Sequence, residues 1–383
     1  MAVEIVGHLV CVVKMRRLLA VLSACLWACG DNRPPSPDSR ADGLFHPAPH
    51  APMPPVLPHA GTVLSNVQLV TLTFDDYAAR AEVEAFGDVI VGSPWYQNVG
   101  MEYGVFPGTH VQKLTLGAAP PSITRDGIEA KIKQLIIDQR VPRPTATGNQ
   151  LLYMIYIPPA VARGAGLAGV RGYHQMIRFD GVQFPIAVVL DTGDLATTTS
   201  TAAHQLINAV TNPYIPPMDG YYADPPMTDP WSLVQGEIAD LCEGAAPVTE
   251  SGFTLPRVYS SLAAVAGRSP CKPFAGDAWS NVSAEPSKMQ MIPKGGSVTF
   301  TLTGWSTEEQ PDWKLATHAA DFSKLTEAEM RPELSDDMIN NSTSVTLTLH
   351  APANAASGAT GGVYVFSLVG ANMHPWAVGF TVQ

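Results

Sequence analysis

The stretch that decides the fold lies in the middle of the chain and reads Thr201-Ala202-Ala203-His204-Gln205-Leu206-Ile207-Asn208-Ala209-Val210-Thr211-Asn212-Pro213. Its apolar residues recur with the i, i+3, i+4, i+7 spacing of one helical face. They are Ala203, Leu206, Ile207 and Val210. The spacing predicts a helix that packs its apolar face on a sheet. His204 and Asn208, four residues apart, are then neighbours on an adjoining face.

The polar residues of this helix occupy the positions of a zinc-hydrolase motif. Helices of the H-E-x-x-[HE] kind place two metal ligands four residues apart, with a glutamate beside the first ligand to take a proton from bound water. Here His204 keeps the first ligand position, while Gln205 stands at the base and Asn208 at the second ligand. Neither amide can carry a negative charge or accept that proton. The pattern predicts the scaffold of a metallohydrolase without its usual chemistry.

Strand and helix signals alternate around this helix, over residues 62–275. The run from Val67 to Phe74 is rich in β-branched residues and predicts a strand, after which Asp75 or Asp76 is expected to cap a helix. Leu151–Ile157 is apolar throughout, as in a strand covered on both faces. The fold class predicted for this part is therefore an α/β, metallohydrolase-like domain.

The carboxy-terminal residues 285–383 have a different pattern. Three runs alternate apolar and polar residues with period two, and Gly, Pro and Asn turns separate them. The runs are 297–303, 344–349 and 363–368. This pattern predicts an all-β sandwich domain after the α/β domain.

The amino terminus, residues 1–29, has the features of an export signal. Arg16 and Arg17 precede a short apolar run that ends in small residues. The run is shorter than the roughly 20 residues that a membrane-spanning helix needs. Two lipobox-like sites compete, ending at Cys25 and Cys29, and Cys29 is favoured because polar residues follow it directly. An ordinary cleaved signal without lipid is the alternative. The localisation predicted is an outer membrane lipoprotein, facing the periplasm or the cell surface.

Residues 30–61 are dominated by Pro, Ala, His and Asp. Closely spaced prolines prevent a helix or a central strand. This composition predicts an extended, semi-rigid tether between the lipid and the globular part.

Cysteine usage agrees with export. Outside the leader only Cys242 and Cys271 remain, and two cysteines in an exported chain most often form a disulfide. The loop closed in this way would add about 3 kcal/mol of stability in the chain-entropy model. Two free buried thiols are the alternative.

The charge balance limits the partners. The chain of 383 residues has a formal net charge of -11, which argues against nucleic acid. The membrane, reached through the lipid anchor, is the first partner predicted. A peptide, a glycan or an envelope protein is the second.

Beyond these patterns, the chain resembles a family of exported bacterial proteins common among myxobacterial lipoproteins. These have a zinc-protease-like helix, H-E-L-x-E-x-x-T-D-P, followed by an acidic motif of the G-E-I-A-D-L-C kind, which is intact here as Gly236-Glu237-Ile238-Ala239-Asp240-Leu241-Cys242-Glu243-Gly244. Thr211-Asn212-Pro213 and Gly220-Tyr221-Tyr222 are distantly similar to the plant phosphate-induced (exordium) proteins. The resemblance covers roughly residues 65–275. This chain departs from it at Gln205 and Asn208.

Helix and acidic motif together suggest one constellation. His204, Glu237 and Asp240, joined by His174, are the candidates for a mixed nitrogen and oxygen metal site, with zinc as the possible metal. The alternative is that Glu237 and Asp240 hydrogen-bond His204 and a nearby loop, so that no cofactor is held.

Two functions follow from these observations. The first is a non-catalytic envelope lipoprotein that binds a peptide, glycan or protein partner through a degenerate metallopeptidase-like domain. The second is an active metal-dependent hydrolase in which Glu237 replaces the lost base.

Overall fold

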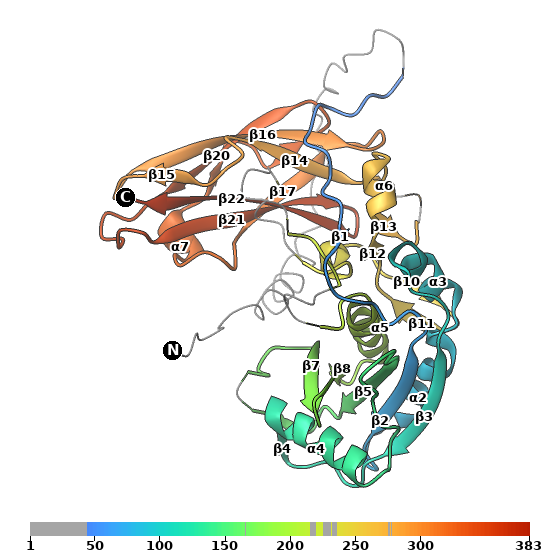
Figure 1. Ribbon diagram of the computed structural model, residues 1–383. Coiled ribbons are helices and arrows are strands. Elements are labelled where there is room, and N and C mark those ends of the chain that lie inside the picture. Colours follow the sequence, from blue (N-terminus) through green and yellow to red (C-terminus); the bar gives the residue numbers. More distant parts are fainter. Residues whose placement is uncertain are drawn as a thin grey trace.

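The computed structural model describes residues 44–383 except 165, 215–219, 225–230, 232–235, 275 and 277 (Figure 1). The predicted leader, both lipidation candidates Cys25 and Cys29, and residues 30–43 of the tether lie outside these described residues. Within the described part, no helix has the length and apolar character to span a membrane. Sheet predominates, because 36 % of the described residues are strand and 20 % are helix.

The first half of the chain is built on a five-stranded sheet of order β3-β2-β5-β8-β7. Four of these strands run parallel, and β7 is antiparallel to β8 at one end. β5 is buried along its whole length, as its apolar run predicted. The bounds are β2 Gln68–Thr73, β3 Thr109–Thr115, β5 Leu151–Ile157, β7 Gly172–Phe179 and β8 Val182–Leu190.

The quoted stretch belongs to helix α5, Leu195–Thr211, which packs against β7 and β8. It begins six residues before the quoted stretch, where the Asp194 side chain caps it by accepting from Thr197 N at 2.9 Å. The apolar stripe is fully buried, as predicted. Its polar face is buried as well: His204 is 8 % and Asn208 is 1 % exposed. The helix is therefore enclosed on both faces, which an amphipathic pattern does not predict.

The other helices of this half are shorter. Their bounds are α2 Arg80–Ile90, α3 Pro94–Gly100, η1 Met101–Tyr103 and α4 Arg125–Ile137. The prediction that Asp75 or Asp76 caps α2 was wrong, because α2 begins at Arg80 and its cap position, Ala79, has no side-chain hydrogen bond. Asp76 instead accepts a hydrogen bond from the backbone N of Ala119, and Asp75 N donates to Gly117 O. Both aspartates thus hold the loop that follows β3.

The carboxy-terminal part contains two sheets that lie one above the other in Figure 1. One has the order β14-β16-β20-β18 and the other β15-β22-β21-β17-β19. Along β16 and β20 apolar and polar residues alternate, and Phe300, Leu302, Leu347 and Leu349 are fully buried. The bounds are β14 Ser280–Glu285, β15 Gln290–Ile292, β16 Ser297–Ser306, β17 Trp313–Ala319, α7 Glu327–Met330, β18 Glu333–Leu334, β19 Met338–Ile339, β20 Ser344–His350, β21 Thr360–Val369 and β22 Asn372–Val382.

The two halves are in contact, and several short elements lie outside the large sheets. The turn between β21 and β22 meets the loop after the acidic motif, where Met373 N donates to Gly244 O at 2.9 Å. No side chain fits at Gly244, because a Cβ atom there would lie 2.0 Å from Met373 O. The elements are β1 Leu57–Pro58 with β9 Tyr221–Tyr222, β4 Ser122–Ile123 with β6 Ala162–Arg163, β10 Val248–Glu250 with β11 Phe253–Leu255, β12 Val258–Tyr259 with β13 Cys271–Lys272, η2 Asp240–Cys242 and α6 Ser261–Val265.

Residues 44–61 differ from the expected tether. Met53 and Val56 are each 3 % exposed, and the ring of His50 stacks on Trp305 with centroids 3.7 Å apart. Ala48 N donates to Asn341 Oδ1 at 2.8 Å. Proline does exclude helix here, but an extended chain can still lie on an apolar surface. The folded part therefore begins before residue 62.

The predicted disulfide is confirmed. Cys242 and Cys271 are bonded, with their Cα atoms 5.8 Å apart. The bond joins the end of η2 to β13, and so links the acidic motif to the small β12–β13 sheet.

Candidate functional site

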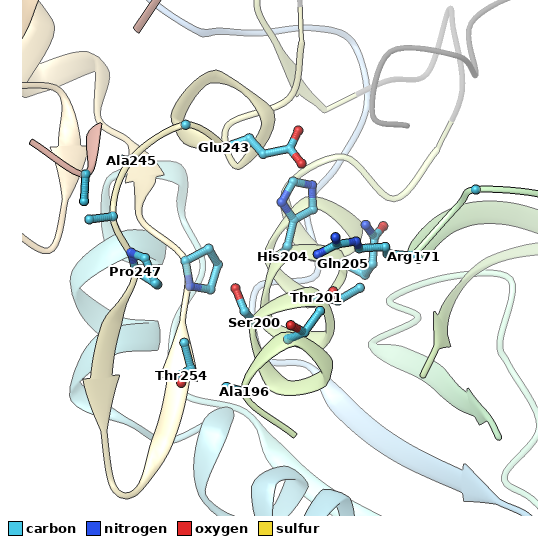
Figure 2. A pocket seen from close by; sticks show the side chains of 17 residues that line it. Arg171, Ala196, Ser200, Thr201, His204, Gln205, Glu243, Ala245, Pro247 and Thr254 are labelled. Atoms are coloured by element: carbon cyan, nitrogen blue, oxygen red, sulfur yellow. The ribbon is translucent and has the colours of Figure 1, made fainter. Parts of the chain in front are cut away.

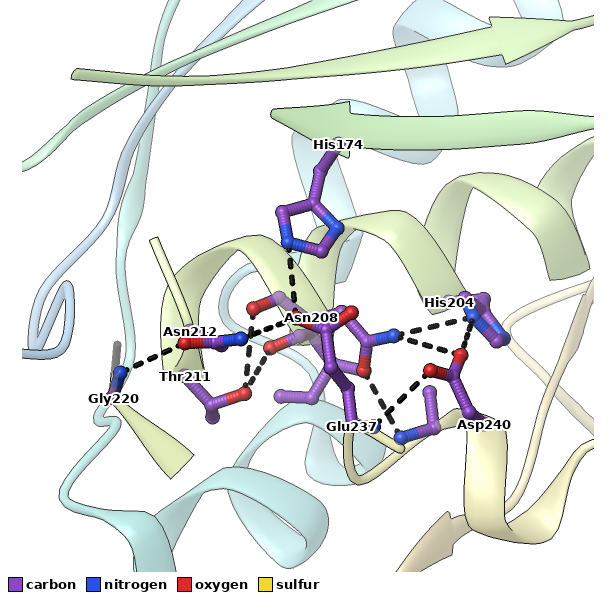
Figure 3. A network of polar contacts seen from close by, with 10 residues as sticks. His174, His204, Asn208, Thr211, Asn212, Gly220, Glu237 and Asp240 are labelled. Atoms are coloured by element: carbon purple, nitrogen blue, oxygen red, sulfur yellow. Dashed lines mark hydrogen bonds and ion pairs between the residues drawn. The ribbon is translucent and has the colours of Figure 1, made fainter. Parts of the chain in front are cut away.

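The candidate residues come from three elements that meet at one side of α5 (Figure 3). α5 supplies His204, Gln205 and Asn208, and the edge strand β7 supplies His174. Glu237 and Asp240 lie in a tight turn, where Asp240 N donates to Glu237 O at 3.0 Å. The turn opens the short 3-10 helix η2.

His204 is paired with Asp240. Its Nε2 lies 2.8 Å from Asp240 Oδ1, and the other carboxylate oxygen accepts from Glu237 N at 3.1 Å. Burial lowers the pKa of His204, but the hydrogen bond and the charge of Asp240 outweigh it and raise the pKa above its ordinary value. For Asp240 burial acts in the opposite direction and raises the pKa, but the hydrogen bond and charge of His204 hold this pKa below its usual range. Both directions favour an ion pair.

His174 is paired with Glu237. Its Nε2 lies 3.2 Å from Glu237 Oε1. Burial lowers the pKa of His174, but the charge of Glu237 and hydrogen bonds with Glu237 and Gln205 raise it overall. Asn212 Nδ2 donates to the same Oε1 atom at 2.6 Å. The acid offered as a replacement base is therefore engaged on two sides.

Asn208 connects α5 to the acidic motif. Ala239 N donates to its Oδ1 at 3.0 Å, which fixes the orientation of the amide. Nδ2 is then turned toward His204 and Asp240, and it lies 3.2 Å from His204 Nε2 and 3.2 Å from Asp240 Oδ1. As a donor it stabilises the carboxylate. Asn208 thus acts as a neutral bridge between His204, Asp240 and Ala239.

Asn212 is a member of the site that we did not predict from the sequence. It follows the last turn of α5, and its Oδ1 accepts from Gly220 N at 2.8 Å while its Nδ2 holds Glu237. Gly220 must be glycine, because a Cβ atom would lie 2.1 Å from Thr211 O. The sequence analysis had singled out the tripeptides Thr211-Asn212-Pro213 and Gly220-Tyr221-Tyr222. Their spacing did not predict the hydrogen bond from Gly220 N to Asn212 Oδ1 that joins them.

The four metal-ligand candidates form two separate pairs. Within the described ranges, no group of three or more His, Cys, Asp or Glu side chains is arranged to hold a metal ion. His174 faces Glu237 and His204 faces Asp240, at 3.2 Å and 2.8 Å. The mixed metal site that the sequence suggested for His204, Glu237, Asp240 and His174 stays a prediction.

A pocket of about 420 Å³ lies beside this network (Figure 2). His204 and Gln205 reach it from the network, and Ser200 and Thr201 line it from the preceding turn of α5. Arg171 and Glu243 add charge at its walls. The remaining lining residues are small or are prolines: Gly169, Gly172, Ala196, Thr197, Gly244, Ala245, Ala246, Pro247, Thr254, Pro256 and Ala371. Ala371 belongs to the β21–β22 turn, so both halves of the chain contribute to the pocket.

Comparison with known proteins leaves the family open. No protein-family model and no curated protein matches this chain. Among solved structures, it is similar to a chimeric titin Z1Z2 functionalised with a KLER exogenous peptide from decorin, at 11 % identity and a TM-score of 0.20 over 28 % of this chain and 95 % of that chain. The titin M3 domain gives 16 % identity and a TM-score of 0.18 over 25 % of this chain and 88 % of that one. A family 123 glycoside hydrolase from Clostridium perfringens gives 10 % identity and a TM-score of 0.19 over 28 % of this chain and 27 % of that one. Likeness at this level carries no functional argument.

Proposed function

We propose that this chain is a non-catalytic binding protein of the cell envelope, anchored through lipid at Cys29. In this proposal residues 62–275 are a degenerate metallopeptidase-like α/β domain, related to the myxobacterial-type lipoproteins, and residues 285–383 are a β-sandwich. The ligand is a peptide, a glycan or an envelope protein, and it binds in the pocket beside α5. The disulfide between Cys242 and Cys271 agrees with an oxidising compartment.

One observation carries the proposal: the polar groups of the motif satisfy one another, while the pocket next to them stays accessible. Asn208 is held by Ala239 N, and Asp240 is held by His204. Gln205, at the position of the general base, is hydrogen-bonded with His174 and has no proton-accepting charge. The residues that hydrolysis would need are used to hold the site together.

The rival function, a metal-dependent hydrolase with Glu237 as base, has less support. A general base must come within about 2.6–3.2 Å of the proton that it takes, or reach it through one water. Glu237 is not among the residues that line the pocket, and Asn212 and His174 occupy its Oε1. To accept a proton at Oε1 it would have to leave both partners.

The test is a hydrolysis assay on zinc-loaded, exported protein with a panel of protease and glycosidase substrates. Wild-type protein and the Glu237→Gln variant are expected to give the same background rate, and dialysed protein is expected to hold less than stoichiometric zinc. A general base typically contributes about 10²–10⁴-fold to the rate. If Glu237 served as base, wild-type protein would therefore be at least about a hundredfold faster than Glu237→Gln. Robust turnover that Glu237→Gln abolishes would overturn the proposal.

A further inference from the structure

The outer edge of β7 is an open strand edge. β7 is the last strand of the sheet order, and it pairs with β8 on one side only. Leu190 N donates to Arg171 O at 2.7 Å, and this sets the phase of the antiparallel ladder. Arg171, Tyr173, Gln175 and Ile177 then face β8 with their backbone groups. Met176 lies opposite Pro185 and directs its backbone groups away from β8. This agrees with proline having no N–H to donate to Met176.

The alternate residues of β7 therefore direct their N–H and C=O groups outward. They are Gly172, His174, Met176 and Arg178. Across the described part of the chain, no backbone hydrogen bond reaches any of these four residues from that side. Such a row of unpaired donors and acceptors is a template for another extended chain.

The open edge begins at the pocket. Gly169, Arg171 and Gly172 line the pocket, and β7 leads away from them. At Gly172 a Cβ atom would lie 2.6 Å from Thr201 Cγ2, so glycine allows α5 to approach the strand closely. A chain lying along β7 would therefore have one end directed at Ser200 and Thr201.

The lining of the pocket favours a peptide over a sugar. Sugar rings are commonly bound by stacking on aromatic side chains, and among the described lining residues there is no Trp, Tyr or Phe. Hydroxyl groups, small side chains and prolines make up most of the lining, together with the polar and charged side chains of Arg171, His204, Gln205 and Glu243. These fit one modest side chain together with its peptide groups.

We propose that β7 binds an extended peptide segment, which adds a strand to the sheet through the partly exposed His174 and Met176, next to the buried Gly172, and places one of its side chains in the pocket. The inference rests on the proposed function, because it assigns the ligand class of the same pocket. Main-chain hydrogen bonds supply the affinity, and the pocket selects the side chain.

The experiment uses the full exported protein and a displayed library of random ten-residue peptides. Peptides enriched on wild-type protein are synthesised and titrated one by one. Met176→Pro removes an outward N–H that the fold does not use, and proline is tolerated on edge strands. Met176→Ala is the matched control, since it changes the side chain and keeps the N–H. We expect the Kd to rise by about tenfold or more with Met176→Pro and to change little with Met176→Ala.

Two further measurements keep the result decisive if Met176→Pro unfolds. Two sets of peptides are N-methylated, one at the odd and one at the even positions. Only one set carries its methyl groups on the N–H groups that would pair with β7, and that set should bind wild-type protein at least about tenfold more weakly, while the other should bind normally. Ala196→Trp, at an exposed position of α5 that lines the pocket, should weaken every selected peptide.

The outcomes separate the two proposals. If peptides bind and are lost with Ala196→Trp but not with Met176→Pro or N-methylation, the pocket function stands and the strand addition is wrong. If no peptide is enriched while an oligosaccharide panel binds in a manner that Ala196→Trp blocks, the ligand class is wrong and the binding function stands. Sedimentation that shows a dimer dispersed by Met176→Pro would assign the edge to a second copy of the chain, and would also overturn the inference.

Discussion

His204 Nε2 lies 2.8 Å from Asp240 Oδ1, although 36 positions separate the two residues in the chain. This contact fastens α5 to the acidic motif. It also gives the histidine a charged partner, and this partner raises the pKa of His204 despite burial. A histidine whose pKa is raised by folding stabilises the fold fully below its unfolded pKa, and this contribution is lost as the pH rises through the folded pKa.

Replacing Asp240 with Asn should remove that contribution. The pKa of His204 should fall, because the hydrogen bond and charge of Asp240 are the largest causes that oppose burial. Stability should then decline less as the pH rises through the range where His204 titrates. At low pH we expect a loss of about 1–3 kcal/mol in the free energy of unfolding. Urea denaturation between about pH 5 and 8, with the His204 Cε1 proton followed by NMR, measures both effects. Glu243→Gln, which removes a charge of smaller effect, should lower the His204 pKa less. An unchanged titration in Asp240→Asn would contradict the pairing.

Restoring the acids of the motif should create zinc affinity. In Gln205→Glu/Asn208→Glu, position 208 should reach the metal with His204, because Asn208 Nδ2 is already 3.2 Å from His204 Nε2. We expect at least a tenfold gain in zinc affinity over the parent, measured by competition with a chromogenic chelator. Gln205→Glu/Asn208→Gln has nearly the same side-chain size without the second charge and should gain much less. A folded double variant that binds zinc no better than the parent would show that α5 is not a degenerate metal site.

Removal of the disulfide should cost stability. Cys242 and Cys271 are 29 residues apart, which corresponds to about 3 kcal/mol in the chain-entropy model. Guanidinium denaturation of Cys242→Ser/Cys271→Ser against oxidised wild type measures the difference. Wild-type protein under reducing conditions is the control and should match the variant. Free-thiol labelling of both cysteines in native exported protein would argue against the bond.

Glu102 should make stability sensitive to acid. Its side chain is 6 % exposed, and Lys272 Nζ donates to its Oε2 at 2.9 Å. Burial raises the pKa of Glu102, but hydrogen bonds from Ser260 and Lys272 outweigh it and lower the pKa below the ordinary value. The stabilisation is therefore present above the unfolded pKa and is lost as the pH falls through the folded one.

Glu102→Gln should accordingly lower the free energy of unfolding by about 1–3 kcal/mol at neutral pH. The gap to wild type should close in acid, where the wild-type carboxylate is also protonated. Glu329→Gln, at the fully exposed carboxylate of the α7 capping box, is the control and should have a smaller effect. A gap that stays constant from neutral to acid pH would rule out a charge-based role for Glu102.

Lipidation at Cys29 remains a prediction, because the leader lies outside the described residues. Mass spectrometry of the mature amino terminus should find an acylated Cys29 after cleavage at Ala28. An acylated Cys25, or an unmodified terminus beyond Ala28, would show that the site was assigned wrongly.

Local patterns in the sequence were sufficient for the secondary structure that depends on burial. The i, i+3, i+4, i+7 stripe of Ala203, Leu206, Ile207 and Val210 predicted α5, and the apolar run Leu151–Ile157 predicted β5. The period-two runs predicted strands β16, β20 and β21 in the same way. The two cysteines of the folded part predicted their own bond.

Other features depended on contacts between distant segments. Asp76 binds the loop after β3 and does not cap α2, because the backbone N of Ala119 competes for its carboxylate. His50 stacks on Trp305 although its neighbourhood is rich in proline. Neither contact leaves a periodic signal, since each joins residues far apart in the chain.

The sequence by itself determined which groups the site contains, because Gln205 and Asn208 are amides and no fold can give an amide a negative charge. Only the tertiary structure decided how these groups pair. His204 meets Asp240 and His174 meets Glu237 because β7, α5 and the disulfide-linked turn come together in space. The physical reason is that hydrogen bonds and ion pairs depend on distances of about 3 Å. Spacing along a chain sets such distances within a helix, but not between elements that tertiary packing brings into contact.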